Sequence, residues 1–301
     1  MKVINNTLDF TLPGAAVMTL GKFDGLHRGH RELIGNILAA RAEKEGASAA
    51  VFSFDAAAST LLTKEERRRM LDGMGIDFLV ECPFVPRIIT MEAEDFVKEV
   101  LVSQMHVCHI AVGEDFHFGY ERAGDAALLE TMGREYGFTT DVLPKVLEKG
   151  REISSTWIRR ELARGEMERV GKLLGYPFFV TGLILHGRRI GRTLGFPTAN
   201  IIPEMDKLLP PNGVYAVRSE VCGKIYNGIT DIGTKPTVNG QFVGVETYLY
   251  DCNSDIDLYG EKMKVEILHH LRPEKKFPSV DALKEQIEHD RLEGKKYFSE
   301  R

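Results

Sequence analysis

Two histidines, His27 and His30, stand three residues apart in the glycine-rich stretch "GKFDGLHRGH" at residues 21–30. The stretch follows the apolar run "AAVMTL" and precedes a helix-like pattern, so we predict a loop between a strand and a helix opening at His30. The first turn of a helix has unpaired N–H groups and attracts anions. We expect both histidines to donate hydrogen bonds to phosphate oxygens. A structural histidine pair and a metal pair are the alternatives, although no third ligand of obvious spacing accompanies them.

A second candidate site lies in "HGRRIGRTLGFPTANI" at residues 186–201. Its three arginines lie between glycines. This pattern is typical of a flexible basic loop that folds over an anion, and the alternative is an ordinary surface loop. Thr198 and Asn200 follow, separated by one residue, so in an extended strand both side chains point to the same face. A hydroxyl and an amide oxygen side by side suit Mg²⁺. The alternative is a turn cap.

A glutamate, Glu246, interrupts the strand-like run "GVETYLY". Glutamate is depleted in strands, so this position invites an explanation. The strand alternation turns Glu246 either to water or toward a ligand site.

The first half of the chain alternates strand-like and helix-like segments, which predicts a parallel sheet with helices on both faces. In such sheets ligands bind at the carboxyl ends of the strands, where the glycine stretch falls. The span "MEAEDFVKEVLVSQM" at residues 91–105 is predicted to form one of the helices.

Near residue 176 the pattern changes to short β-rich runs separated by glycine and proline, which predicts a small antiparallel barrel or sandwich. A helix follows, capped by Ser279, and Val280, Leu283 and Ile287 form an apolar stripe that could dock on the barrel.

Composition narrows the functional class. The 301 residues are 43% hydrophobic and 28% charged, as in globular proteins, and the net charge of -5 offers no basic stripe for nucleic acid. No segment could serve as a signal peptide or span a bilayer, so we expect a cytoplasmic protein without a membrane partner. We also expect a monomer or a weak homo-oligomer. The cysteines are far apart, which suits reduced thiols: Cys82, Cys108, Cys222 and Cys252.

Three stretches of the first half resemble the flavin adenylyltransferase module of the nucleotidylyltransferase superfamily. They are "GKFDGLHRGH", "VGEDFHFGYERAGD" at residues 112–125 and "ISSTWIRREL" at residues 153–162. The resemblance implies phosphate contacts from both histidines and flavin contacts from Asp115 and Phe116. The nucleotide-binding residues that it implies are Gly21, Phe23, Asp24, Gly25, Gly29, Ser154, Ser155, Thr156 and Arg159.

The second half resembles riboflavin kinase, through "GFPTAN" and most of the later strands. The resemblance implies that Glu246 is the catalytic base and that Thr198 and Asn200 bind Mg²⁺. Asn227 and Thr237 are predicted to line the flavin or the nucleotide, with a purely structural role as the alternative. The remaining ATP-binding positions that it implies are Gly187, Gly191, Arg192 and Gly195.

One stretch departs from the adenylyltransferase pattern. Where that family carries a histidine and prolines, in a "TFxPHP"-like run, this chain reads "FSFDAAAS" with Ala56, Ala57 and Ala58. The departure keeps open a kinase whose adenylyltransferase half is impaired or vestigial.

We therefore predict an α/β half and a β half: a Rossmann-like adenylyltransferase domain at 1–155, a helical linker at 156–177, and a riboflavin-kinase barrel with a terminal helix at 178–301. The predicted function is ATP-dependent phosphorylation of riboflavin to FMN, followed by adenylylation of FMN to FAD with release of pyrophosphate. The rival predictions are a different nucleotidylyltransferase and a non-enzymatic flavin-binding protein.

Overall fold

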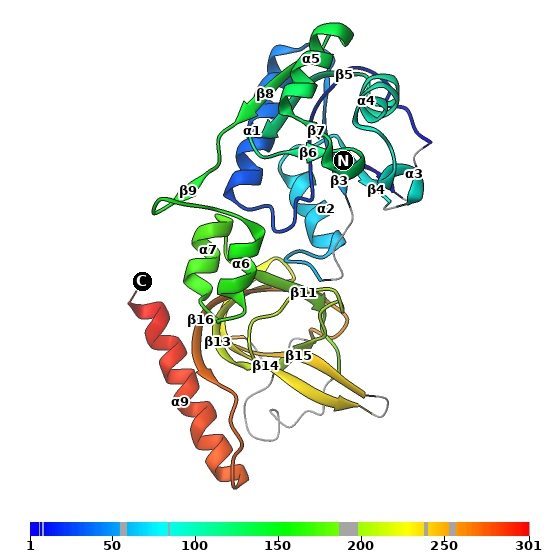
Figure 1. Ribbon diagram of the computed structural model, residues 1–301. Coiled ribbons are helices and arrows are strands. Elements are labelled where there is room, and N and C mark those ends of the chain that lie inside the picture. The colour runs from blue at the N-terminus through cyan, green and yellow to red at the C-terminus, as the bar shows by residue number, and fades with distance from the viewer. Residues whose placement is uncertain are drawn as a thin grey trace. The chain divides into compact units, whose positions relative to one another are not determined.

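The computed structural model describes residues 1–5, 7, 9–54, 59–83, 85–186, 198–237, 240–252 and 257–300. The chain divides into two compact units, Met1–Ser155 and Thr156–Arg301, here called the N-terminal and C-terminal units (Figure 1). Over the described ranges, none of the helices combines the length and apolarity needed to cross a membrane.

The N-terminal unit is built on a six-stranded parallel sheet with the strand order β1-β4-β3-β2-β5-β8. Because β2 pairs with β3 on one side and with β5 on the other, the chain reverses its direction of travel across the sheet at β2. The parallel α/β architecture predicted from the sequence is confirmed. Its strands are β1 (Lys2–Asn5), β2 (Ala16–Gly21), β3 (Ser48–Phe54), β4 (Phe78–Cys82), β5 (Val107–Gly113) and β8 (Thr139–Leu143).

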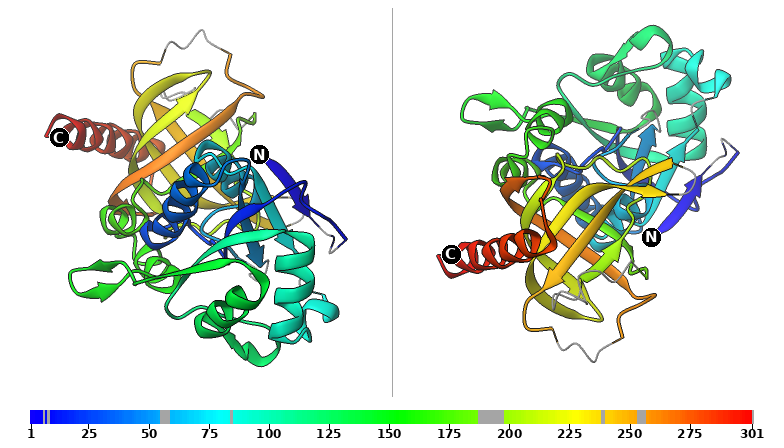
Figure 2. Two further views of the ribbon diagram at one scale, coloured as in Figure 1. Left: turned by 90° about the horizontal axis from the view of Figure 1, so that it is seen from above. Right: turned by 90° about the horizontal axis from the view of Figure 1, so that it is seen from below.

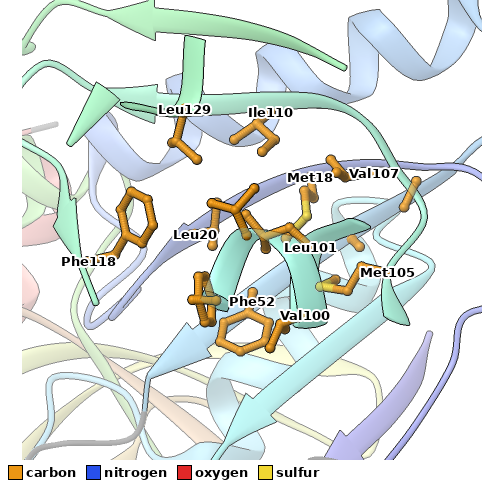
Figure 3. Packing of buried hydrophobic residues seen from close by; sticks show 14 of the residues in the cluster. Met18, Leu20, Phe52, Val100, Leu101, Met105, Val107, Ile110, Phe118 and Leu129 are labelled. Carbon is orange, nitrogen blue, oxygen red and sulfur yellow. The ribbon is translucent and has the colours of Figure 1, made fainter. Parts of the chain in front are cut away.

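Helices cover both faces of this sheet. One face carries Met18, Leu20 and Phe52, which pack under η1 and α5 in the main apolar cluster (Figure 3). α1 contacts β2, β3 and β5 on the opposite face. The helices are α1 (Arg28–Glu43), α2 (Lys64–Gly73), α3 (Pro86–Ile89), α4 (Ala93–Asp95), η1 (Phe96–Gln104), η2 (Tyr120–Arg122) and α5 (Ala126–Tyr136).

The helix predicted over residues 91–105 differs from expectation. Only α4 is α-helical, and η1 is a π-helix whose end is marked by the bond from Met105 N to Val100 O at 2.9 Å. Short strand pairs lie outside the main sheet: β6 (His117–Phe118) with β7 (Gly124–Asp125), and β9 (Leu147–Glu148) with β10 (Arg151–Glu152).

The C-terminal unit is a six-stranded antiparallel sheet ordered β11-β16-β13-β14-β15-β12. Its edge strands approach each other, and Leu185 N donates to Asn200 O at 2.8 Å, so the sheet curls into a small barrel. The predicted barrel is confirmed. Its strands are β11 (Phe179–Leu183), β12 (Thr198–Ile201), β13 (Gly213–Val221), β14 (Lys224–Thr237), β15 (Gly240–Leu249) and β16 (Lys262–Pro273).

The described part of the C-terminal unit also contains helices α6 (Ser155–Leu162), whose first residue belongs to the N-terminal unit, α7 (Met167–Leu174) and α9 (Val280–Ser299). α7 packs on β16, and α9 lies along the outside of the barrel against β13, β14 and β16 (Figures 1 and 2). Ser279 caps α9 as predicted, by accepting a bond from Ala282 N.

The apolar stripe predicted for α9 is wrong at its first position. Val280 is 62% exposed, and the fully buried residues of the helix are instead Asp290 and Gly294. Arg272 of β16 forms a bidentate ion pair with Asp290, and Phe298 packs against the apolar cluster of Val214, Ile229 and Tyr250. An ion pair, a close backbone approach at Gly294 and apolar packing near the end of the helix therefore dock α9.

Candidate functional site

Two neighbouring strands of the N-terminal unit end in loops that carry predicted site residues. β2 ends at Gly21 and β5 ends at Gly113, and the strand order reverses between them. Asp115 and Phe116 lie two and three residues after the end of β5, and the glycine loop follows β2. Open α/β sheets bind ligands at such a reversal point, so the structure brings the two predicted groups to one sheet edge.

The glycine loop turns sharply. Phe23, Gly25 and Leu26 have φ values of 47°, 85° and 38°, in the left-handed region that only glycine adopts freely. The side chains of Phe23 and Leu26 are fully buried, so packing holds this unfavourable backbone in place. The turn delivers His27 to the start of α1.

The two histidines lie together at that helix start. α1 begins at Arg28, not at His30 as predicted, because His27 is the N-cap: its Nδ1 accepts a bond from His30 N at 3.4 Å. The rings stack with centroids 3.7 Å apart. Since Nδ1 of His27 is the acceptor, the ring proton lies on Nε2, which is then a donor.

Both imidazoles are neutral near pH 7. Burial lowers the pKa of His27 to about 4, opposed in part by the charge of Asp24. Burial and, secondly, His27 hold the pKa of His30 well below its usual value. His30 Nδ1 is buried and has no hydrogen-bond partner within the described residues, which fits an atom reserved for a ligand.

Two glycines of this stretch make room for site side chains. A Cβ added to Gly29 would lie 3.3 Å from the ring of His27, and one added to Gly21 would lie 3.3 Å from the ring of Phe23. The family resemblance implies that both glycines are nucleotide-binding positions. The structure adds that they let the two rings adopt their positions.

A serine of the "ISST" stretch reaches the glycine loop. Ser155 Oγ donates to the carbonyl oxygen of Asp24 at 2.9 Å, and Asp24 Oδ1 accepts from Leu61 N at 2.7 Å. Ser154 directly precedes this contact. Thr156 and Arg159 follow on α6, which continues into the C-terminal unit, with Thr156 exposed and Arg159 half-buried.

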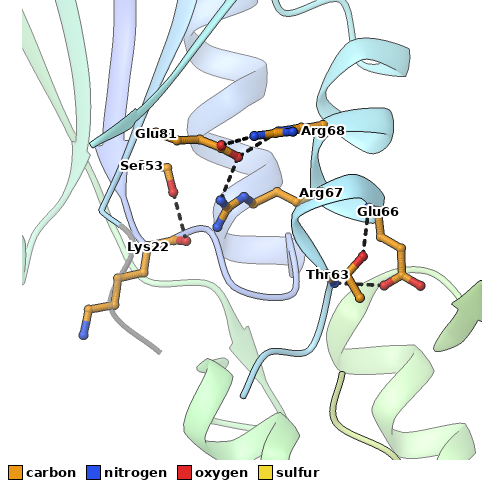
Figure 4. Close-up of polar contacts among 7 residues, drawn as sticks. All are labelled: Lys22, Ser53, Thr63, Glu66, Arg67, Arg68 and Glu81. Atoms are coloured by element: carbon orange, nitrogen blue, oxygen red, sulfur yellow. Dashed lines mark hydrogen bonds and ion pairs between the residues drawn. The ribbon is translucent and has the colours of Figure 1, made fainter. Parts of the chain in front are cut away.

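A buried ion cluster supports the same edge of the sheet (Figure 4). Arg67 and Arg68 of α2 both pair with Glu81 of β4, whose side chain is 2% exposed, and Arg67 Nη2 lies 3.1 Å from Glu81 Oε1. Nearby, Ser53 Oγ donates to Lys22 O at 3.4 Å and so ties the end of β3 to the glycine loop. A buried carboxylate requires such pairing, so the cluster fixes α2.

The barrel brings the second set of predicted residues together. In the antiparallel register Asn200 stands opposite Glu246, and Thr198 stands opposite Tyr248. Directly opposed residues share a face, so Thr198, Asn200 and Glu246 project from one face, while the intervening residues are buried inside the barrel. Glu246 is half-buried. Asn200 Nδ2 lies 3.4 Å from Thr198 Oγ1.

The register also adds a residue that sequence reasoning missed. Asp231 of β14 stands opposite Glu246 on its other side, which places two carboxylates in adjacent positions of one cross-strand row. Only the pairing of β14 with β15 reveals this, because 15 residues of sequence separate the two side chains along the chain.

The two predicted flavin residues of β14 are not beside Glu246. Asn227 is exposed, and lies four residues from Asp231, about 13 Å along an extended strand. Thr237 lies six residues away in the opposite direction, and its side chain is outside the described residues. The other predicted positions outside the described residues are Ala56, Ala57, Ala58, Gly187, Gly191, Arg192 and Gly195.

No metal site of the histidine, cysteine or acidic type was found in the described ranges, which contain no group of three such side chains. The oxygen pair of Thr198 and Asn200 is a different kind of donor set.

Comparisons with known proteins agree with the two-unit organisation. The family profile described as FAD synthetase matches residues 10–157, and the one described as riboflavin kinase matches residues 174–298. The bifunctional riboflavin kinase/FMN adenylyltransferase of Escherichia coli (strain K12) is 38% identical over 294 residues, covering 94% of this chain and 92% of its own. The protein of the same name from Bacillus subtilis (strain 168) is 34% identical over 299 residues, covering 94% and 93%.

A solved structure has the same architecture over nearly the full length. The crystal structure of a Streptococcus pneumoniae protein described as a macrolide-efflux protein superposes with a TM-score of 0.85 at 30% identity, covering 96% of this chain and 97% of its own.

Proposed function

The chain belongs to the bifunctional riboflavin kinase/FMN adenylyltransferase family, whose two activities make FMN and FAD, and from this premise we propose which of its residues carry each reaction. The C-terminal unit would transfer the γ-phosphoryl group of ATP to riboflavin. The N-terminal unit would join FMN to the adenylyl group of a second ATP. Separate residue clusters in the two units support this division.

In the kinase unit Glu246 is the proposed general base. Its carboxylate would accept the proton of the riboflavin 5′-hydroxyl as that oxygen attacks the γ-phosphorus and ADP leaves. Phosphoryl transfer depends mainly on positioning and charge neutralisation. The cross-strand alignment of Glu246 with Asn200 is the observation that supports this assignment, because it sets the base beside the proposed nucleotide residues.

The donor set of Thr198 and Asn200 fits magnesium. A hydroxyl and an amide oxygen are hard ligands, and two such ligands suit an ion that keeps several waters and binds through nucleotide phosphates. When bound with ATP, magnesium would neutralise charge on the phosphate oxygens. Thr198 and Asn200 would hold the nucleotide complex on the face that also carries Glu246.

In the adenylyltransferase unit, neutral His27 and His30 are proposed to donate hydrogen bonds to phosphate oxygens. An FMN phosphate oxygen would attack the α-phosphorus of ATP, and the bond to pyrophosphate would break. Nε2–H of His27 and the N–H groups at the start of α1 would bind the phosphate oxygens as charge shifts toward pyrophosphate. The stacked histidine pair, in which the His27 side chain and His30 Nδ1 are buried, carries this half of the proposal.

The direct experiment is a time course with riboflavin, ATP and Mg²⁺, in which chromatography separates FMN from FAD. We expect FMN to appear first and FAD to follow, and FMN with ATP to yield FAD and pyrophosphate. FMN that accumulates without FAD or pyrophosphate would establish the rival function, a kinase with an inactive N-terminal unit, which the run Ala56, Ala57 and Ala58 motivates.

A further inference from the structure

A short hairpin precedes the "ISST" stretch, and its side chains reach back to the site. Strands β9 and β10 pair as Glu148 with Arg151, across a two-residue turn in which Lys149 and Gly150 have φ values of 50° and 78°. Ile153 N then donates to Val146 O at 2.9 Å. Residues 145–155, here called the strap, therefore form one ordered segment within the N-terminal unit.

Lys145 is the first residue of the strap, and its side chain contacts the loop after β5. Its Nζ lies 3.2 Å from Asp115 Oδ2 and 2.7 Å from Glu152 Oε2, so one ammonium serves two carboxylates. The Lys145 side chain is 27% exposed. Hydrogen bonds to Glu152 and then to Asp115 raise the pKa of Lys145, so it stays charged at neutral pH.

The strap has two further anchors on the other side of the site. Glu148 Oε2 lies 2.7 Å from Arg28 Nη1, and Arg28 is the first residue of α1, next to His27. Ser155, at the end of the strap, donates to Asp24 O in the glycine loop. The strap thus links the loop after β5, the start of α1 and the glycine loop.

We propose that Lys145 is a positioning residue for adenylyl transfer: it orients the Asp115 carboxylate toward the hydroxyl-bearing chain of FMN and neutralises its charge. This inference rests on the proposed function of the N-terminal unit. The side chain of Asp115 is 69% exposed, and among the described residues it forms an ion pair with Lys145. FMN enters with a phosphate dianion, so an uncompensated carboxylate at this edge would repel it.

The perturbation is Lys145→Met, with Lys145→Arg as the conservative replacement. Lys149→Met is the matched control, because Lys149 is an exposed lysine of the same hairpin that forms no ion pair among the described residues. Steady-state kinetics with FMN and ATP give KM for FMN and kcat separately. Hydrogen exchange of β2 and β5 reports whether the N-terminal unit keeps its fold.

We expect Lys145→Met to raise KM for FMN about two- to fivefold, the upper part of the range for a partly exposed ion pair, with kcat within about twofold. Lys145→Arg should restore most of the affinity, and Lys149→Met should behave as the unchanged protein. If Lys145 acts through Asp115, then Lys145→Met should add little to the KM of an Asp115→Asn variant.

Two results would overturn the inference while leaving adenylyl transfer in place. One is a KM for FMN in Lys145→Met equal to that of Lys149→Met. The other is a fall in kcat together with faster exchange throughout β2 and β5, which Lys145→Arg does not rescue, because that pattern is a general loss of structure. An unaltered protein that makes no FAD from FMN would instead refute the proposed function, and the inference with it.

Discussion

Acidification should destabilise the N-terminal unit through the buried imidazole of His27. His27 is 7% exposed, stacks on His30 and caps α1, so the folded state has no room to solvate an imidazolium. Burial is the main reason that its pKa falls to about 4, from a usual value of 6.5. The unfolded chain therefore binds this proton more readily than the folded chain.

The sign and size follow from linkage. Between pH 6.5 and 4 the unfolded state carries more protons, so the free energy of unfolding falls as the pH falls through this window. The difference between the usual pKa of 6.5 and about 4 corresponds to about 3 kcal/mol, and about 2 kcal/mol of it should be lost by pH 5. His30, whose pKa is also lowered by burial, adds to the loss in the same direction.

The assay compares the unaltered protein with His27→Gln at pH 7.5 and pH 5.0. Urea titrations read by hydrogen exchange of β2 and α1, corrected for the intrinsic exchange rates, isolate the N-terminal unit from the barrel. The substitution removes the N-cap bond at both pH values, but it should lose about 2 kcal/mol less than the unaltered protein on acidification. Equal losses in the two proteins would show that His27 is not the group being protonated.

Three further outcomes test the two units. Glu246→Gln should lower FMN formation by about 10²–10⁴-fold while Mg-ATP binding persists, and near-normal turnover in a kinase assay would remove it from the role of base. Replacing His27 and His30 together by Asn should abolish FAD formation from FMN but spare FMN formation from riboflavin, and equal loss of both products in a folded variant would contradict separate sites. In Gly294→Ala the new Cβ would lie 2.3 Å from Tyr250 Oη, so α9 must shift and the free energy of unfolding of the C-terminal unit should fall by about 1–3 kcal/mol in urea titrations. An unchanged midpoint there would show that α9 has room to adjust.

Docking of α9 illustrates where periodicity misleads. Apolar spacing selected Val280, Leu283 and Ile287, yet Val280 is exposed and the buried positions are Asp290 and Gly294. Asp290 and Gly294 contribute no apolar signal to the sequence pattern. Asp290 contacts the barrel through an ion pair, and Gly294 permits close approach because it has no Cβ. The π-helix η1 is a similar case, since its apolar residues predict a helix but do not distinguish an α-helix from a π-helix.

Local patterns in the sequence were enough to predict the two architectures and to select both histidines, Glu246 and the Thr198–Asn200 pair as candidate site residues, because strand, loop and helix patterns are local along the chain. The neighbours of these residues became known only from the packing of the folded chain. Asp231 meets Glu246 through strand register, and Lys145 meets Asp115 across 30 residues of sequence. Burial that keeps His27 neutral is likewise a property of the folded unit. Register, burial and ion pairing are relations between distant segments, and such relations arise only when those segments pack together.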